Sequence, residues 1–92
     1  MITPNYSQQA RELVRDCINA EVDPDQQVDL DDVFVVWFCK TLKNWKALVS
    51  TTQPNAWYYE LTHNGETGQT YIDCYAKITQ IISTPISGEA SA

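Results

Sequence analysis

Apolar residues recur every three or four positions in the first part of the chain, which predicts an amphipathic helix. Thr3-Pro4 marks its start, because threonine caps free N–H groups and proline fits the first helical turn. Pro24 cannot lie inside a helix, so we expect this one to end near Glu21. Its apolar stripe consists of Tyr6, Ala10, Leu13, Val14, Cys17 and Ile18.

The middle of the chain changes to β-branched and aromatic residues, which favour strands. Residues 33–42 form the first predicted strand, which is apolar on both faces and should be covered on both sides. Lys43-Asn44 is the predicted turn into a second strand over residues 45–52. A third strand covers residues 57–63, and Asn64-Gly65 predicts the turn that follows it.

The last periodic segment, residues 71–82, predicts a closing helix, because Thr70 and Asp73 have the spacing of a capping box. A short fourth strand over residues 69–75 is the alternative, since this segment also contains β-formers. The predicted fold is α+β, in the order α-β-β-β-α, with a three-stranded antiparallel sheet and two helices on one face. We expect one domain over residues 1–82 and a flexible tail over residues 83–92.

A two-residue turn at Lys43-Asn44 would pair Phe38 with Val49 and Leu42 with Trp45. The more apolar face should then lie under the helices, and a loop of odd length would change which residues share each face. The predicted helix face consists of Phe34, Val36, Phe38, Leu42, Trp45, Ala47 and Val49. The predicted open face consists of Trp37, Cys39, Leu48, Ser50, Tyr58, Glu60 and Thr62.

Composition and charge exclude several classes of function. The chain is acidic, with a net charge of −6, which disfavours binding to bulk nucleic acid. Its N-terminus has no signal pattern, and its longest apolar run, residues 33–39, is far shorter than the ~20 residues that cross a bilayer. We therefore expect a cytosolic protein.

Cys17, Cys39 and Cys74 are odd in number and lack a C-x-x-C motif, which predicts free, mostly buried thiols.

The segment over residues 21–32 is the most acidic part of the chain, with six of its twelve residues Asp or Glu. As a calcium loop starting at Asp23 it fails, because Val28 stands at the glycine position and Phe34 at the bidentate glutamate position. We expect no metal. The segment is interpreted as a solvated connector, or as a contact patch for a basic partner.

Catalytic chemistry has few candidates. His63 is the one histidine, so a nucleophile–base pair would be Cys39–His63 or Cys74–His63. The plain interpretation is a surface histidine and packed thiols. The sequence has neither a phosphate-binding loop nor a dinucleotide fingerprint. We expect a non-enzyme without a cofactor.

Two binding hypotheses remain. The open face has an aromatic centre and a charged rim, which is typical of protein interfaces. Its predicted partner-binding residues are Trp37, Cys39, Leu48, Tyr58 and Glu60. The alternative is a nucleic-acid-binding hairpin, in which lysines bind phosphates and a nearby aromatic ring stacks on bases. The residues of this alternative are Lys40, Lys43, Trp45 and Lys46.

Six runs of the sequence form one pattern along the chain: VWFCKTL (36–42), NWKAL (44–48), STT (50–52), YYELT (58–62), NG (64–65) and YIDCYAK (71–77). Together they resemble a family of small uncharacterised proteins from tailed bacteriophages and prophages. The resemblance covers roughly residues 6–80. Family members typically have Asp-Ala-Tyr where this chain has Asp73-Cys74-Tyr75, and the tail from Ile82 is a departure.

This resemblance implies a phage accessory protein in the cytoplasm of a bacterial host, with no assigned activity. The predicted function is therefore non-catalytic binding of a host or phage protein, with inhibition of a host defence protein as its most concrete form. We also expect a homodimer, formed through the open face or through the edge of residues 33–39. The alternative is a nucleic-acid-binding regulator.

Overall fold

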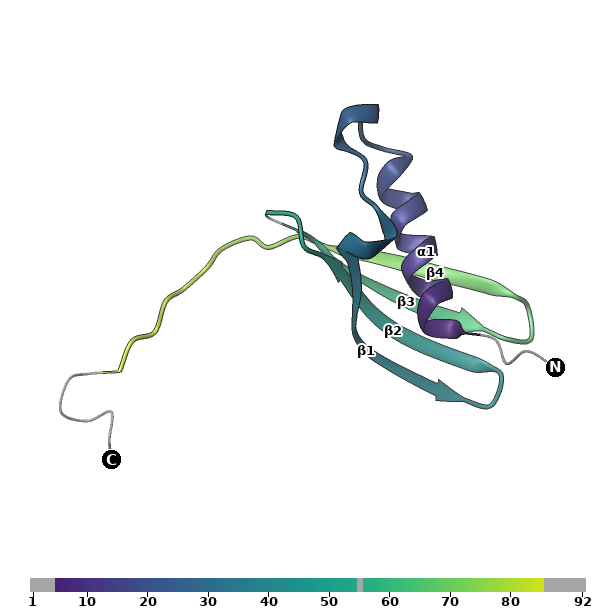
Figure 1. Cartoon of the computed structure of the whole chain (residues 1–92). Helices are drawn as coiled ribbons and strands as arrows, with labels where there is room; N and C mark the ends of the chain where they lie inside the picture. The colour runs from purple at the N-terminus through teal and green to yellow at the C-terminus, as the bar shows by residue number, and fades with distance from the viewer. Residues whose placement is uncertain (1–4, 55, 86–92) are drawn as a thin grey trace.

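Figure 1 shows the computed structural model of the chain, which describes residues 5–54 and 56–85. The strands form one antiparallel sheet in the order β1-β2-β3-β4, and the helix α1 lies across one face of it (Figure 1). In chain order the elements are α1 (Tyr6–Asn19), the short 3-10 helices η1 (Pro24–Gln26) and η2 (Leu30–Asp32), and the strands β1 (Val33–Thr41), β2 (Asn44–Thr51), β3 (Tyr58–Asn64) and β4 (Gln69–Tyr75).

The prediction of three strands and two helices is wrong. Within the described residues the chain has one α-helix and a four-stranded sheet. The segment predicted to open a closing helix is β4, as the fourth-strand alternative proposed, and residues 76–85 continue as exposed chain without regular structure. Ile72 shows why, because it pairs with Leu61 of β3 and is half-buried. The cross-strand ladder outweighs the local capping signal.

Helix α1 begins with a side-chain cap. The Asn5 Oδ1 accepts a hydrogen bond from the backbone N–H of Gln8 at 2.9 Å, which satisfies one free donor of the first turn. The predicted start at Thr3-Pro4 lies outside the described residues, and the helix ends at Asn19, two residues before the predicted end.

Two side chains of α1 hold the acidic segment in place. Arg11 donates from Nε to the carbonyl of Val33 at 2.8 Å and from Nη2 to the carbonyl of Leu30 at 2.7 Å. Asn19 donates from Nδ2 to the carbonyl of Val28 at 3.0 Å, and its Oδ1 accepts from the N–H of Val28 at 2.8 Å. The second half of the connector, residues 28–33, is therefore fixed to the helix.

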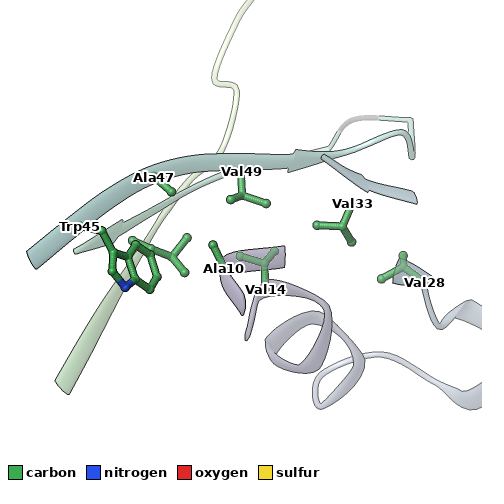
Figure 2. Packing of buried hydrophobic residues seen from close by; sticks show 8 residues of the cluster. Ala10, Val14, Val28, Val33, Trp45, Ala47 and Val49 are labelled. Atoms are coloured by element: carbon green, nitrogen blue, oxygen red, sulfur yellow. The ribbon is translucent and has the colours of Figure 1, made fainter. Parts of the chain in front are cut away.

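The core lies between α1 and the sheet. Figure 2 shows Ala10 and Val14 of the helix facing Ala47 and Val49 of β2. Small side chains at Ala10 and Ala47 let the helix approach the sheet closely. The buried apolar residues are Ala10, Val14, Val28, Val33, Trp45, Ala47, Val49 and Leu61.

The turn between β1 and β2 lies one residue earlier than predicted. It consists of Leu42 and Lys43, and Leu42 takes a φ of 55°, so Thr41 pairs with Asn44. The predicted pairs Phe38–Val49 and Leu42–Trp45 are wrong, and Phe38 pairs with Ala47 instead. Leu42 is exposed in the turn.

A β-bulge in β1 lies between Val35 and Trp37 and leaves Val36 without a paired residue. The bulge shifts the alternation of side chains by one residue. Odd-numbered Val33 and Val35 therefore face the helix before the bulge, and even-numbered Phe38 faces it after the bulge. Of the predicted helix face, Phe38, Trp45, Ala47 and Val49 are placed correctly. The placement of Phe34, Val36 and Leu42 is wrong, because all three are exposed.

The cysteines are free, as predicted, but the expectation that they are mostly buried is wrong, because all three are exposed. Cys39 lies on the face opposite α1. Cys74 lies on the helix side, yet α1 packs mainly against β1 and β2, so the helix leaves this part of β4 uncovered. In the described part of the chain, no helix is long and apolar enough to cross a membrane.

Candidate functional site

The sheet face opposite α1 carries five aromatic side chains that are each 41–60% exposed, and we call it the aromatic face. They are Phe34, Trp37, Tyr58, Tyr71 and Tyr75. The strand register brings them together, because side chains of paired residues point to the same side of a sheet. In the middle row Trp37 pairs with Leu48, Leu48 with Glu60, and Glu60 with Asp73, and in a neighbouring row Tyr58 pairs with Tyr75.

Polar contacts fix the centre of the aromatic face. The Lys46 Nζ lies 3.7 Å from Glu60 Oε2, and the Tyr75 hydroxyl donates to Glu60 Oε1 at 3.4 Å. The negative charge of Glu60 is the main reason why the pKa of Tyr75 is raised. Glu60 therefore connects a cation on β2 and a phenol on β4 across the face.

All five predicted partner-binding residues lie on this one face. The register places Trp37 beside Leu48, Cys39 beside Lys46, and Glu60 beside Leu48, with Tyr58 two residues before Glu60 on β3. Their role in binding stays a prediction.

Sequence reasoning missed three rings of the face. The sequence pattern places Phe34 on the opposite side because no local signal marks the bulge, and it places Tyr71 and Tyr75 in the predicted closing helix. The period-two spacing of Tyr71, Asp73 and Tyr75 was the signal that could have found the latter two.

A hollow of about 460 Å³ lies at the turn end of the aromatic face. Cys39, Lys46, Thr62 and Tyr71 contribute to its lining. It is large enough for one or two side chains of a partner. The arrangement of a hollow beside exposed rings suits an apolar anchor residue.

The structure does not bring the four residues of the nucleic-acid hypothesis onto one surface. Trp45 is 2% exposed and cannot stack on a base. Lys40 lies on the helix side, with its Nζ 5.6 Å from the ring centroid of Tyr6, whereas Lys46 lies on the aromatic face and Lys43 in the turn.

Neither candidate catalytic pair is assembled. His63 pairs with Trp45 on the helix side, whereas Cys39 faces the other side of the sheet. Cys74 lies four residues along β4 from Thr70, the partner of His63, which is a separation of about 13 Å. Among residues 5–54 and 56–85, no group of three or more His, Cys, Asp or Glu side chains could hold a metal ion.

A second open surface lies on the other side of the sheet, where α1 leaves β3 and β4 uncovered. Here a groove of about 1060 Å³ runs between the end of α1, the acidic segment and the strands. We call it the helix-side groove. Its lining is mostly apolar and includes Cys17, Ile18, Val22, Val28, Pro54, Ala56, Trp57, Tyr59 and Cys74, with Glu21 and Asp25 among the polar residues.

Two groups that line this groove, the Cys17 thiol and the Tyr59 phenol, have raised pKa values. Cys17 is exposed as a residue, but partial burial of its thiol is the main reason why the pKa of this group is raised, and the nearby Cys74 and Asp16 add to it. Burial likewise raises the pKa of Tyr59, with Cys74 and Cys17 as further causes. Cys17 of α1, Tyr59 of β3 and Cys74 of β4 are therefore electrostatic neighbours across the groove.

Comparison with known proteins gives a family but no function. No curated protein and no solved structure matches the chain. A family model matches residues 7–85, which takes in α1 except its first residue, the whole sheet and the segment after β4. The sequence resembled an uncharacterised family, and this match shows that the chain belongs to the family of unknown function DUF6275.

Proposed function

We propose that this protein is a non-catalytic binding protein that holds a partner protein against its aromatic face. The observation that supports this most is the set of five half-exposed aromatic rings on one sheet face. Apolar patches of this kind on small proteins usually mark interaction sites. Aromatic residues are also enriched among the residues that carry most of the energy of protein interfaces.

The charges on the aromatic face indicate what kind of surface it fits. Glu60 and Asp73 pair in its middle row, and Lys46 already offsets part of the charge of Glu60. The excess is negative, as is the net charge of −6 of the whole chain. A partner surface with an apolar anchor and a basic rim would complement this face.

The resemblance to proteins of tailed bacteriophages supports an infected bacterium as the setting. In that setting the partner is a host or phage protein, and inhibition of a host defence protein is the most concrete form of the activity. The protein would then act in the cytoplasm of the bacterial host.

Capture of a partner from an infected-cell lysate, followed by titration of the purified partner, tests the proposal. Trp37→Ala and Tyr58→Ala should each weaken binding by about 10- to 100-fold, because each removes an aromatic contact. Leu42→Ser is the matched control, because Leu42 is exposed in the β1–β2 turn, away from the centre of the face. Equal affinities for all three variants would contradict the proposal.

The nucleic-acid alternative is tested by gel shift with single- and double-stranded DNA and RNA at low salt. The aromatic-face proposal expects no shift. Salt-sensitive binding that Lys43→Glu abolishes would instead support the alternative, since charge reversal removes a phosphate contact.

A further inference from the structure

The C-terminal segment, residues 76–85, is an apolar strip without a place in the fold. All ten of its residues are exposed, and Figure 1 shows it running away from the sheet. Ile78, Ile81 and Ile82 are 97%, 86% and 80% exposed. Three isoleucines this open are unfavourable in water, so the segment needs an apolar surface to cover.

The three isoleucines have the spacing of one face of a helix, since positions i, i+3 and i+4 are neighbours on a helix surface. Thr79 and Gln80 fall between them and supply the polar side. Ten residues make a helix about 15 Å long. A single amphipathic helix of this size needs a groove rather than a flat face.

The helix-side groove matches this segment in polarity and in charge. Tyr59, Trp57 and Cys74 form an apolar floor of the groove, because α1 packs mainly against β1 and β2 and does not cover this part of the molecule. Glu21 and Asp25 lie on its lining, and Lys77 is the one charged residue of the segment. A cation at the start of the segment would therefore complement two acids at the groove.

The direction of β4 decides which chain supplies the segment. β4 ends at Tyr75, one residue after Cys74 of the groove lining, and its own segment then runs away from the sheet (Figure 1). Residues 76–84 contain no Gly, Pro, Asn or Asp, the residue types that favour tight reversals. A segment that leads away from its own groove and lacks turn-forming residues is well suited to exchange between two copies.

We propose that the protein forms a homodimer in which the C-terminal segment of each copy packs as a helix into the helix-side groove of the other. The isoleucines cover the exposed parts of β3 and β4, and Lys77 faces Glu21 and Asp25. This contact lies on the opposite side of the sheet from the aromatic face. The dimer is therefore independent of the proposed partner binding and presents two free aromatic faces.

Light scattering of the full-length protein at micromolar concentration tests the dimer. The wild type should have the mass of a dimer, and Ile78→Asp/Ile81→Asp should raise the dissociation constant by about 100-fold or more, because it places charges in an apolar groove. Gln80→Asp is the matched control and should remain a dimer. A wild-type monomer, or a dimer that the double variant leaves intact, would overturn the proposal.

The charge contact has its own test. Lys77→Glu should weaken the dimer, and adding Glu21→Lys and Asp25→Lys should restore it, because the three changes together re-create opposite charges. Trp37→Ala, on the aromatic face, should leave the dimer unchanged. Loss of the dimer in Trp37→Ala would place the contact on the aromatic face instead.

A disulfide trap distinguishes exchange between copies from folding back within one copy. In a Cys39→Ser background, Ile81→Cys should form a disulfide with Cys74 or Cys17 of the other copy under mild oxidation and give a covalent dimer on a non-reducing gel. Glu66→Cys, in the turn at the other end of the sheet, is the control and should not cross-link. A monomer with an internal disulfide, or no disulfide, would overturn the exchange.

Discussion

The indole of Trp45 and the imidazole of His63 stack with their ring centroids 5.0 Å apart and an angle of 11° between the ring planes. Phe38 and Tyr6 surround the same indole at centroid distances of 5.8 Å and 6.4 Å. His63 is held in turn by Thr70, whose Oγ1 lies 2.7 Å from His63 Nδ1. One buried ring thus connects the helix with β1, β2 and β3, and through His63 with β4.

Removal of the Trp45 ring should strongly destabilise the fold. Trp45→Ala should lower the free energy of unfolding by about 3–5 kcal/mol, because a large buried side chain leaves a cavity. Trp37→Ala, on the aromatic face, should change it by no more than about 0.5 kcal/mol. Urea denaturation followed by circular dichroism measures both, and similar losses in the two variants would contradict the assigned core.

A more conservative change at the same position tests the polar atom of the indole. Trp45 Nε1 is buried and has no hydrogen-bond partner in the described part of the chain. Trp45→Phe removes this unsatisfied donor together with some packing, so its cost should stay within about 1.5 kcal/mol. A loss as large as that of Trp45→Ala would show that the indole N–H has a partner in solution.

Arg11 should contribute more to stability than the neighbouring Arg15. Arg11 donates to two backbone carbonyls, those of Val33 and Leu30, whereas Arg15 pairs with the adjacent, exposed Asp16. Arg11→Met leaves both carbonyls without their charged donor and should cost about 1.5–3 kcal/mol. Arg15→Met should cost less than about 1 kcal/mol. The two variants are compared in the same urea titration, and the reverse ranking would refute the assignment.

The two glycines of the β3–β4 turn should respond differently to alanine. A Cβ at Gly65 would overlap the backbone carbonyl of Lys43, whereas a Cβ at Gly68 meets no atom within 4 Å. Gly68 has a φ of +77°, so Gly68→Ala carries only the left-handed backbone penalty of about 1–2 kcal/mol. Gly65→Ala forces two turns apart and should lower the melting temperature further than Gly68→Ala. Equal shifts would show that the turns do not touch.

Stability should fall in alkaline solution. Burial raises the pKa values of Cys17 and Tyr59 above their ordinary values of 9.0 and 10.0, so the folded protein holds these protons more tightly than the unfolded chain. Their contribution is complete below pH 9 and is lost as the pH rises through the raised pKa values. Urea titrations from pH 8 to 11 should show this loss, and Cys17→Ser/Tyr59→Phe should reduce it. An unchanged slope in the double variant would contradict the shifts.

The sequence was sufficient where local pattern and tertiary structure agree. The stripe from Tyr6 to Ile18 forms one helix, and Asn64-Gly65 begins a turn between strands, as the residue types predicted. The prediction that Trp37, Leu48 and Glu60 share a face also agrees with the observed register. This prediction is correct because Phe38 pairs with Ala47 in place of Val49, which is a shift of two residues. A shift of two residues leaves each side chain of β2 on the same face of the sheet.

The remaining features depend on contacts that no local pattern contains. The bulge at Val36 is stable because Val33 and Val35 reach the core beside α1, which only the packed structure defines. The end of the chain shows the same problem in reverse. Helical spacing continues from Tyr71 to Ile82, yet pairing of Ile72 with Leu61 takes the first half into the sheet. The isoleucines of the second half are exposed and pack against none of the described residues of the core.

The bulge at Val36 also affects how copies of this protein can aggregate. β1 is an edge strand, and a regular edge offers an uninterrupted row of N–H and C=O groups to an incoming strand. The bulge breaks that row near its middle and increases the local twist, so a strand added there would lose its ladder after a few residues. Strand addition, and with it fibril growth, is therefore hindered at β1, and β4 remains the more permissive edge.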